Sequence, residues 1–436
     1  VKTYRNGNYE RKTALELISN LPGVYVPQIH KAKADRKLVT GRAVKSLEDT
    51  PYPTSLIIPH TEAVHDRVVL EVMRGCSRGC RFCQAGMLTR PVRERSVELL
   101  CNQAEELLRG TGYDEIALSS LSSADHSRIN ELVTGLIDRY EEERIGISLP
   151  SLRADARCVE LAAEIQRVRK SGLTFAPEAG TQRLRDVINK NVSEEDLLNA
   201  VAAAVDNGWK RLKLYFMIGL PTETDEDIEG IANLVKSVLF TARNHGTKLA
   251  LNVTISPFVP KPHTPFQWNA MVEPDELQRR IDLLRSLIKM KNVQLSWHEP
   301  GSSRIEAVLA RGDAKVGSVI YEAWKLGANL GQVRFNQELW DNAFSAAEMN
   351  ISDYANREYS LEEPLPWDFV CVGVSKTYLA NENRKAMQGW TTNDCRNGCT
   401  GCGVKAAFGL DICPPKPVTN EMFDVRCIET SDEPEV

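Results

Sequence analysis

The chain has 436 residues, of which 42% are hydrophobic and 26% are charged, and its formal net charge is −5. These values are ordinary for a globular protein, and the length excludes a disulfide-bonded miniprotein although there are 11 cysteines. No run of 18 or more apolar residues predicts a membrane span, and the net charge gives no sign of a nucleic-acid or anionic-membrane partner.

From Arg67 onward, segments with strand pattern alternate with segments with helical periodicity. Strands are predicted over residues 67–75, 114–120, 145–155, 172–180, 210–221, 247–260 and 292–300. Helices are predicted over residues 96–110, 127–144, 156–170, 193–209 and 274–290, and from residue 225 onward. Two helix starts carry capping-box spacing, Ser193 with Asp196 and Thr224 with Asp227.

This alternation predicts an α/β fold with a parallel sheet and right-handed crossovers. Six to seven β–α units favour an open, partial (β/α)6-type barrel over a closed eight-stranded one. Four regions are expected: a helical and linker segment over 1–66, the barrel over 67–300, a helical extension over 301–350, and a loop-rich C-terminal extension over 351–436.

The first cysteine cluster lies just after the first predicted strand, in the segment MRGCSRGCRFCQAG. Its spacing is C-x3-C-x2-C, at Cys76, Cys80 and Cys83. A four-iron cluster ordinarily takes four thiolates, so three would leave one iron open to an external ligand. Gly75 and Gly79 permit the tight loop that such a site needs. The segment also has three arginines that would favour an anionic cluster: Arg74, Arg78 and Arg81.

The spacing, with the aromatic Phe82 before the last cysteine, resembles the radical S-adenosylmethionine (SAM) superfamily. The segments RGCSRGCRFCQAG, APEAGTQRLR, YFMIGLPTET and FVPKPHTPFQW further resemble an uncharacterised family of radical SAM proteins. Its members are often fused to a cobalamin-binding domain and are related to the methylthiotransferases. The resemblance covers about residues 20–415 and implies a radical SAM barrel whose 4Fe-4S cluster, on Cys76, Cys80 and Cys83, binds and cleaves SAM.

Other strand ends are expected to contact SAM. The resemblance places Ser119 and Ser120 near the methionyl amine and Met217 beside the adenine. Glu178 is suited to the ribose hydroxyls. Arg183 and Arg153 are the alternatives for the carboxylate, since a guanidinium binds a carboxylate in bidentate fashion.

A second cluster repeats the spacing at Cys395, Cys399 and Cys402, and Cys413 follows eleven residues later. Four thiolates would hold a closed second 4Fe-4S cluster that relays electrons or has a structural role. Three would leave an iron free for a substrate or a sulfur donor. Zinc is the alternative metal, because four cysteines in a short loop-rich segment also suit a structural zinc site.

Cobalamin is not expected in this chain, because residues 1–66 are too short for a cobalamin domain and none of the seven histidines lies in a D-x-H-x-x-G pattern. An upstream segment could supply it. No signal peptide is predicted, so the expected location is the reducing cytoplasm.

The predicted function is that of a radical SAM enzyme of methyltransferase or methylthiotransferase type. A 5′-deoxyadenosyl radical would abstract hydrogen from a substrate that the sequence does not identify, and methyl or sulfur transfer would follow. The electron would come from an external donor such as a flavodoxin or ferredoxin. The alternative function is a non-catalytic iron–sulfur or zinc scaffold that binds RNA or a protein partner.

Overall fold

The computed structural model describes residues 10–30, 38–61, 66–149, 156–165, 172–328, 335–409 and 413. Two parallel sheets form its centre. One contains, in spatial order, β2 (Val68–Glu71), β5 (Glu115–Ser119) and β6 (Gly146–Ser148). The other contains β7 (Leu173–Glu178), β8 (Arg211–Ile218), β9 (Ala250–Pro257) and β10 (Val293–Trp297). The predicted α/β class with parallel strands is confirmed.

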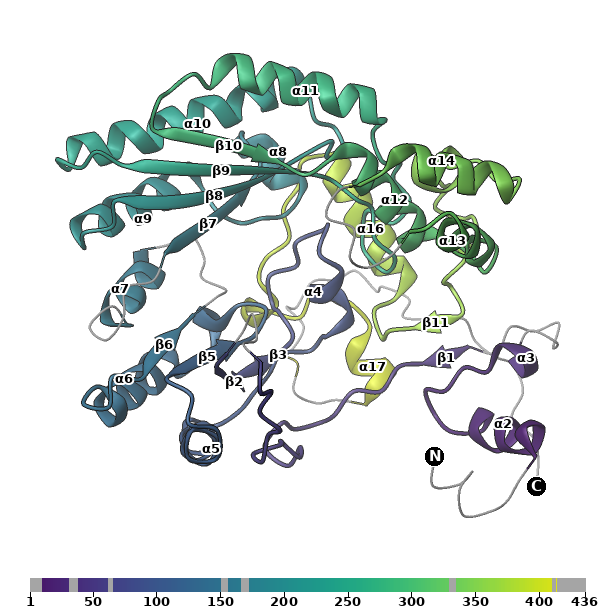
Figure 1. Ribbon diagram of the computed structural model, residues 1–436, viewed down its shortest axis with the longest axis horizontal. Helices are drawn as coiled ribbons and strands as arrows, with labels where there is room; N and C mark the ends of the chain where they lie inside the picture. Colours follow the sequence, from purple (N-terminus) through teal and green to yellow (C-terminus); the bar gives the residue numbers. More distant parts are fainter. Residues whose placement is uncertain are drawn as a thin grey trace.

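Helices connect successive strands, as the sequence predicts. They are α5 (Val97–Thr111), α6 (Ile129–Tyr140), α7 (Ala156–Ile165), α8 (Gln182–Val187), α9 (Glu194–Asp206), α10 (Asp225–Asn244) and α11 (Pro274–Leu287). Both predicted capping boxes are present at the starts of α9 and α10. Figure 1 shows α10 and α11 along the four-stranded sheet and α5 and α6 along the three-stranded one.

The strands bury one face against these helices. In β8 every second residue is buried, and the apolar core beneath it includes Leu212, Leu214, Phe216 and Ile218. The alternate positions of β8, Tyr215 and Met217 among them, are exposed or partly exposed. The face of the sheet opposite the helices therefore carries side chains that a ligand can reach. Among the described residues no ladder pairs β6 with β7, so a single partial barrel stays a prediction.

The predicted helical extension contains α12 (Pro300–Arg311), α13 (Val316–Lys325) and α14 (Gln337–Ala346). Beyond it lie α15 (Ser352–Ala355), α16 (Lys376–Met387) and α17 (Val404–Phe408), and β11 (Val370–Cys371) pairs in parallel with β1 (Val39–Thr40). Near the N-terminus are α2 (Arg11–Ser19) and α3 (Pro27–His30).

The expectation that 351–436 is loop-rich misses α16, a helix of 12 residues. Its inward face carries the polar residues Glu382 and Asn383, both buried, which interrupt the apolar periodicity that sequence analysis relies on. In Figure 1 the yellow C-terminal segment returns from α16 toward α4 (Gln84–Leu88) and β3 (Met73–Arg74). Within the described ranges, none of the helices combines the length and the apolar character that crossing a membrane requires.

Candidate metal centres at two cysteine clusters

The first cysteine loop lies between β3 and α4, and β3 pairs antiparallel with β4 (Arg93–Glu94). Gly75 and Gly79 have positive φ angles of 94° and 79°. A Cβ atom on Gly75 would lie 2.5 Å from the carbonyl oxygen of Pro91. Cys83 caps α4, because its Sγ accepts a hydrogen bond from the backbone N–H of Gly86 at 3.3 Å. The expected tight, glycine-dependent loop is therefore confirmed.

The three thiols of this loop are partly buried and influence one another. Burial, together with the charges of Cys80 and Cys83, raises the pKa of Cys76 to about 11. Burial and Cys80 likewise raise the pKa of Cys83. In the described parts of the chain, no three Cys, His, Asp or Glu side chains are arranged to hold a single metal ion. The donor set nevertheless fits an iron–sulfur cluster, because neighbouring thiolates that repel one another gain from cationic irons between them.

The arginines of the loop are paired with carboxylates. Arg74 pairs with Glu71 at 2.8 Å. Arg78 pairs with Asp125, in the turn that follows β5, and with Asp394 at 3.2 Å. Arg78 is thus the link between the cysteine loop, the end of β5 and the C-terminal segment.

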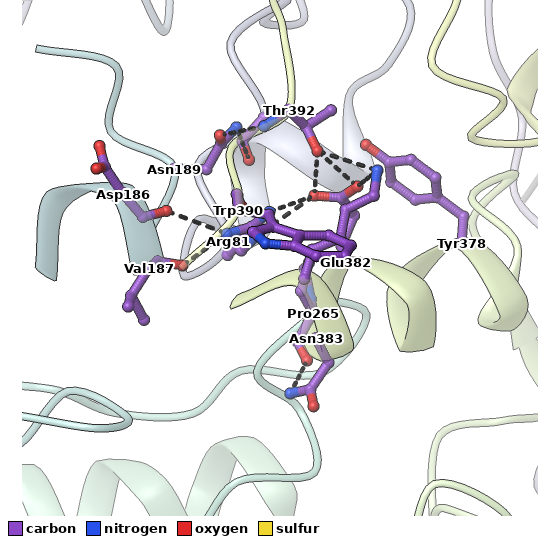
Figure 2. Close-up of polar contacts among 12 residues, drawn as sticks. Arg81, Asp186, Val187, Asn189, Pro265, Tyr378, Glu382, Asn383, Trp390 and Thr392 are labelled. Carbon is purple, nitrogen blue, oxygen red and sulfur yellow. Dashed lines mark hydrogen bonds and ion pairs between the residues drawn. The ribbon is translucent and has the colours of Figure 1, made fainter. Parts of the chain in front are cut away.

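Arg81 ties the loop to the C-terminal segment from inside the protein (Figure 2). Its side chain is fully buried and pairs with Glu382 of α16 at 3.1 Å. It also donates hydrogen bonds to the carbonyl oxygens of Asp186 at 3.1 Å, Val187 at 2.9 Å and Trp390 at 2.7 Å. The contacts of Arg81 are therefore structural, and its charge is neutralised by Glu382 rather than directed at the thiols.

The second cluster lies directly against the first. Cys395, Cys399, Cys402 and Cys413 line one small cavity of about 30 Å³, and Cys76 lines it too. The backbone N–H of Cys395 donates to the carbonyl oxygen of Ser77 at 3.1 Å. Burial raises the pKa of Cys413, and Cys402 and Cys399 raise it further. The structure thus brings the predicted fourth cysteine together with the other three.

Glu178 lies at the end of β7 and beside the first cysteine loop. Its carboxylate accepts a hydrogen bond from Lys190 Nζ at 3.0 Å, and this Nζ lies 6.0 Å from the centroid of the Phe82 ring. Burial raises the pKa of Cys83, while the charge of Lys190 acts to lower it and that of Glu178 to raise it. The carboxylate, the ammonium group and the aromatic ring therefore surround the Cys83 end of the loop.

Met217 and Phe82 pack against the same apolar cluster, which includes Leu220 and Phe258. Ser119 and Ser120 lie at the carboxyl end of β5, and Ser120 Oγ lies 2.9 Å from Ser123 Oγ. The guanidinium of Arg183 pairs with Asp227 and donates to the carbonyl oxygen of Thr222 at 2.9 Å. Arg153 lies outside the described residues.

Comparison with known proteins decides the family. The sequence model of the Radical SAM superfamily matches residues 70–235, a stretch that contains the first cysteine loop and the strand ends around it. This chain is a radical SAM protein.

Relatives of this radical SAM protein include methylthiotransferases. A protein of Methanocaldococcus jannaschii is 34% identical over 69% of this chain and 63% of the relative. A tRNA-2-methylthio-N(6)-dimethylallyladenosine synthase of Desulforamulus reducens is 25% identical over 56% of this chain and 52% of the relative. A ribosomal protein uS12 methylthiotransferase of Pelotomaculum thermopropionicum is 24% identical over 52% of this chain and 54% of the relative. The chain therefore spans between half and two thirds of the length of these relatives.

Solved structures similar to this radical SAM protein include two cobalamin-dependent or cobalamin-bound enzymes. The methyltransferase TsrM of Kitasatospora setae, with cobalamin and a [4Fe-4S] cluster bound, is 13% identical with a TM-score of 0.41, over 65% of this chain and 61% of that one. The radical enzyme OxsB, with aqua-cobalamin and SAM bound, is 14% identical with a TM-score of 0.37, over 73% of this chain and 53% of that one.

Two basic residues near the cysteines of this radical SAM protein have no signal in the sequence. Lys190 stands in the short link between α8 and α9, which matches no motif. Arg90 follows α4 and lines the cavity of the second cluster. Their positions depend on contacts with residues far away in the chain, so only the folded structure reveals them.

Proposed function

We propose that the chain is a radical SAM enzyme in which Cys76, Cys80 and Cys83 hold a 4Fe-4S cluster with one iron open to SAM. The observation that carries this proposal is the group of mutually interacting thiols on a glycine-dependent loop, with Glu178 and Lys190 beside Cys83. When bound, the cluster supplies one electron to SAM, whose S–C5′ bond breaks to give methionine and a 5′-deoxyadenosyl radical that abstracts hydrogen from the substrate.

The charged groups beside Cys83 suit the two polar ends of SAM. Glu178 is the acceptor for the ribose hydroxyls. Lys190 and Arg183 are the candidate cations for the methionyl carboxylate, and each is paired with a carboxylate of the protein, Glu178 and Asp227 respectively. Arg153 is a further alternative for the cation that binds the methionyl carboxylate.

Uncharged groups complete the proposed SAM site. Phe82 and Met217, on one apolar cluster, form the wall beside the adenine. Ser119 and Ser120, at the end of β5, face the methionyl amine. The neighbouring turn is tied to the cysteine loop by the Arg78–Asp125 pair, which supports this placement.

The two sheets belong, in this proposal, to one partial (β/α)6-type barrel over 67–300, between segment 1–66 and the extensions 301–350 and 351–436. The consecutive parallel order of strands within each sheet supports it. A flavodoxin or ferredoxin would donate the electron. The reducing cytoplasm is the expected location, because it keeps the thiols of both clusters free to bind iron.

The second site, in the same proposal, holds another 4Fe-4S cluster on Cys395, Cys399, Cys402 and Cys413. Their common cavity supports a four-thiolate site, and zinc is the alternative occupant. We assign no cobalamin site to this chain.

Methyl or sulfur transfer is the proposed step after hydrogen abstraction. The named relatives are methylthiotransferases that act on tRNA or on ribosomal protein uS12. SAM with a labelled methyl group distinguishes the two reactions in products formed from cell extract: transfer of the methyl group alone indicates methylation, and transfer together with a new sulfur indicates methylthiolation.

The test of the enzyme proposal is SAM cleavage by the anaerobically reconstituted protein with dithionite. We expect 5′-deoxyadenosine from the wild type and at least a hundredfold less from Cys83→Ala. Cys101→Ala is the matched control. Cys101 of α5 packs against the apolar core around β2 and β5, and it does not line the cavity that the two clusters share. Full iron loading without 5′-deoxyadenosine would favour the non-catalytic scaffold, and so would unchanged turnover in Cys83→Ala.

A further inference from the structure

The two cysteine clusters share a wall, although Ser77 and Asp394 beside them are 317 residues apart in the chain. The Ser77 hydroxyl donates to the Asp394 carboxylate at 3.0 Å. Cys76 of the first loop lines the same cavity as the four cysteines of the second. A charge placed in this wall acts on both sites.

Arg90 supplies such a charge. Its side chain is 4% exposed. Its Nε donates to the carbonyl oxygen of Gly86 at 3.2 Å, and its Nη1 donates to the Tyr378 hydroxyl at 3.3 Å. Its Nη2 lies 3.4 Å from the point that a Cβ atom on Gly79 would occupy. The guanidinium therefore rests against the first cysteine loop while α16 holds it from the other side.

The same guanidinium faces the second set of cysteines. It lines their cavity together with Cys395, Cys399, Cys402 and Cys413. A guanidinium is not deprotonated in proteins, so Arg90 carries a fixed positive charge in this wall.

A fixed buried cation beside a thiolate-bound cluster favours the more negative, reduced form. Hydrogen bonds to the ligating sulfurs act in the same direction, and both are recognised ways in which a protein sets a reduction potential. Because the Arg90 side chain is buried, its charge is poorly screened by water.

We propose that Arg90 is a positioning residue that sets the reduction potential of the second cluster and fixes its loop against the first. This inference rests on the proposed function for the presence of that cluster. Arg90 acts through its fixed charge and through the planar guanidinium that lines the cavity beside the four cysteines, so the ranking Arg, Lys, Gln at position 90 should give successively lower potentials.

The experiment is a redox titration of the cluster-loaded full chain, followed by electron paramagnetic resonance. The signal that SAM does not change is assigned to the second cluster. Arg90→Gln should lower its one-electron reduction equilibrium constant at least tenfold, a shift of about 59 mV. Arg90→Lys keeps the charge but loses the planar donor. Its reduction equilibrium constant should therefore lie between those of the wild type and Arg90→Gln, at least threefold below the wild-type value.

Arg93→Gln is the matched control. Arg93 is also buried and lies in the same segment, but it donates to the carbonyl oxygens of Pro91, Val44 and Thr89. It should leave the potential unchanged. If Arg90→Gln does not fold, Arg90→Lys decides alone: a potential equal to that of the wild type overturns the inference.

Iron, sulfide and zinc counts separate this inference from the function on which it rests. Two clusters per chain with an unmoved potential in the Arg90 variants would overturn the role of Arg90 alone. Zinc without iron at the second site would overturn this role and the second cluster together. SAM cleavage at the first site would stand in both cases.

Discussion

At the scale of single residues, Gly75 controls how the chain enters the first cysteine loop. Its φ of 94° is rare for residues with a side chain, and a Cβ atom would meet the Pro91 carbonyl oxygen. We expect Gly75→Ala to destabilise the protein by more than about 2 kcal/mol, since the left-handed conformation alone costs about 1–2 kcal/mol. Denaturant unfolding and iron content after reconstitution measure the effect.

The control for this substitution is Gly135→Ala, in the middle of α6. Apart from the neighbouring residues and backbone of α6 itself, no atom lies within 4 Å of the Cβ position there. Alanine is the better helix former, so this variant should gain about 0.5–1 kcal/mol and load iron normally. Equal stability of the two variants would contradict the argument from backbone geometry.

His263 gives a pH-dependent prediction at the same scale. Burial lowers its pKa to about 4, against 6.5 in an unfolded chain, and Asp368 opposes this only in part. Between these values the unfolded chain binds more protons, so stability falls as pH falls through this window. The expected loss between pH 7 and 5 is about 1 kcal/mol, because the side chain is only partly buried.

The comparison variant is His263→Asn, since asparagine tolerates the positive φ of 58° at this position. Its urea-unfolding free energy should fall less than that of the wild type between pH 7 and 5. His60→Asn, which changes an exposed histidine, should follow the wild type. Parallel pH curves for wild type and His263→Asn would refute the prediction.

Sequence patterns identified the two cysteine clusters, which the structure brings together, better than the residues around them. The spacing of Cys76, Cys80 and Cys83 is local, so the sequence contains it in full. Lys190 and Arg90 owe their importance to neighbours brought by other elements, and a lone basic residue carries no motif. Arg183 also follows a strand end, and the structure pairs it with Asp227 of α10, a partner that the local pattern does not indicate; its contact with SAM stays a prediction.

At the scale of elements, local signals predicted most helices and strands. The capping boxes at Ser193 and Thr224 depend on residues three apart, so they were predicted and are present. Helix α16 was missed because it buries Glu382 where an apolar residue would be expected. The reason is a partner on another element: Glu382 neutralises Arg81 of the cysteine loop.

This buried pair should be worth more than surface pairs. Glu382→Ala leaves the guanidinium of Arg81 buried without a counter-charge, which typically costs about 3–5 kcal/mol. Asp282→Ala is the control, because it removes an ion pair with Arg285 in which both side chains are more than half exposed. That change should cost no more than about 1 kcal/mol.

Denaturant unfolding of the cluster-loaded protein under anaerobic conditions compares the two variants. A double variant, Arg81→Met with Glu382→Leu, should be at least as stable as Glu382→Ala, because no isolated charge is then buried. Similar losses for Glu382→Ala and Asp282→Ala would show that the Arg81–Glu382 pair does not hold the loop to α16.

At the scale of the whole molecule, the C-terminal region completes the first cysteine site. Sequence analysis treated 351–436 as an extension that carries its own cluster. In the structure, Glu382, the Trp390 carbonyl and Asp394 all bind the loop that contains the first three cysteines. No local pattern could predict this, because the contacts join segments about 300 residues apart.

A chain that ends at Glu358 tests this dependence. It keeps the carbonyl oxygens of Ala355 and Arg357, to which Arg311 donates, although Arg311 loses the ring of Tyr359. The loop loses Glu382 and the Trp390 carbonyl, which bind Arg81, and Asp394, which binds Ser77. We expect iron at the first site to fall below half of the full-chain value. Amide hydrogen exchange across residues 76–90 should also become faster.

The full chain with Cys399→Ser and Cys402→Ser is the control that separates packing from the second cluster. It lacks two second-site ligands but keeps Glu382, Asp394 and the Trp390 carbonyl, so the first site should still load its iron and exchange slowly. If this double variant loses first-site iron as completely as the shortened chain, the second cluster itself supports the loop. If the shortened chain loads iron normally, the first site folds without the C-terminal region, and the buried contacts of Arg81 are dispensable.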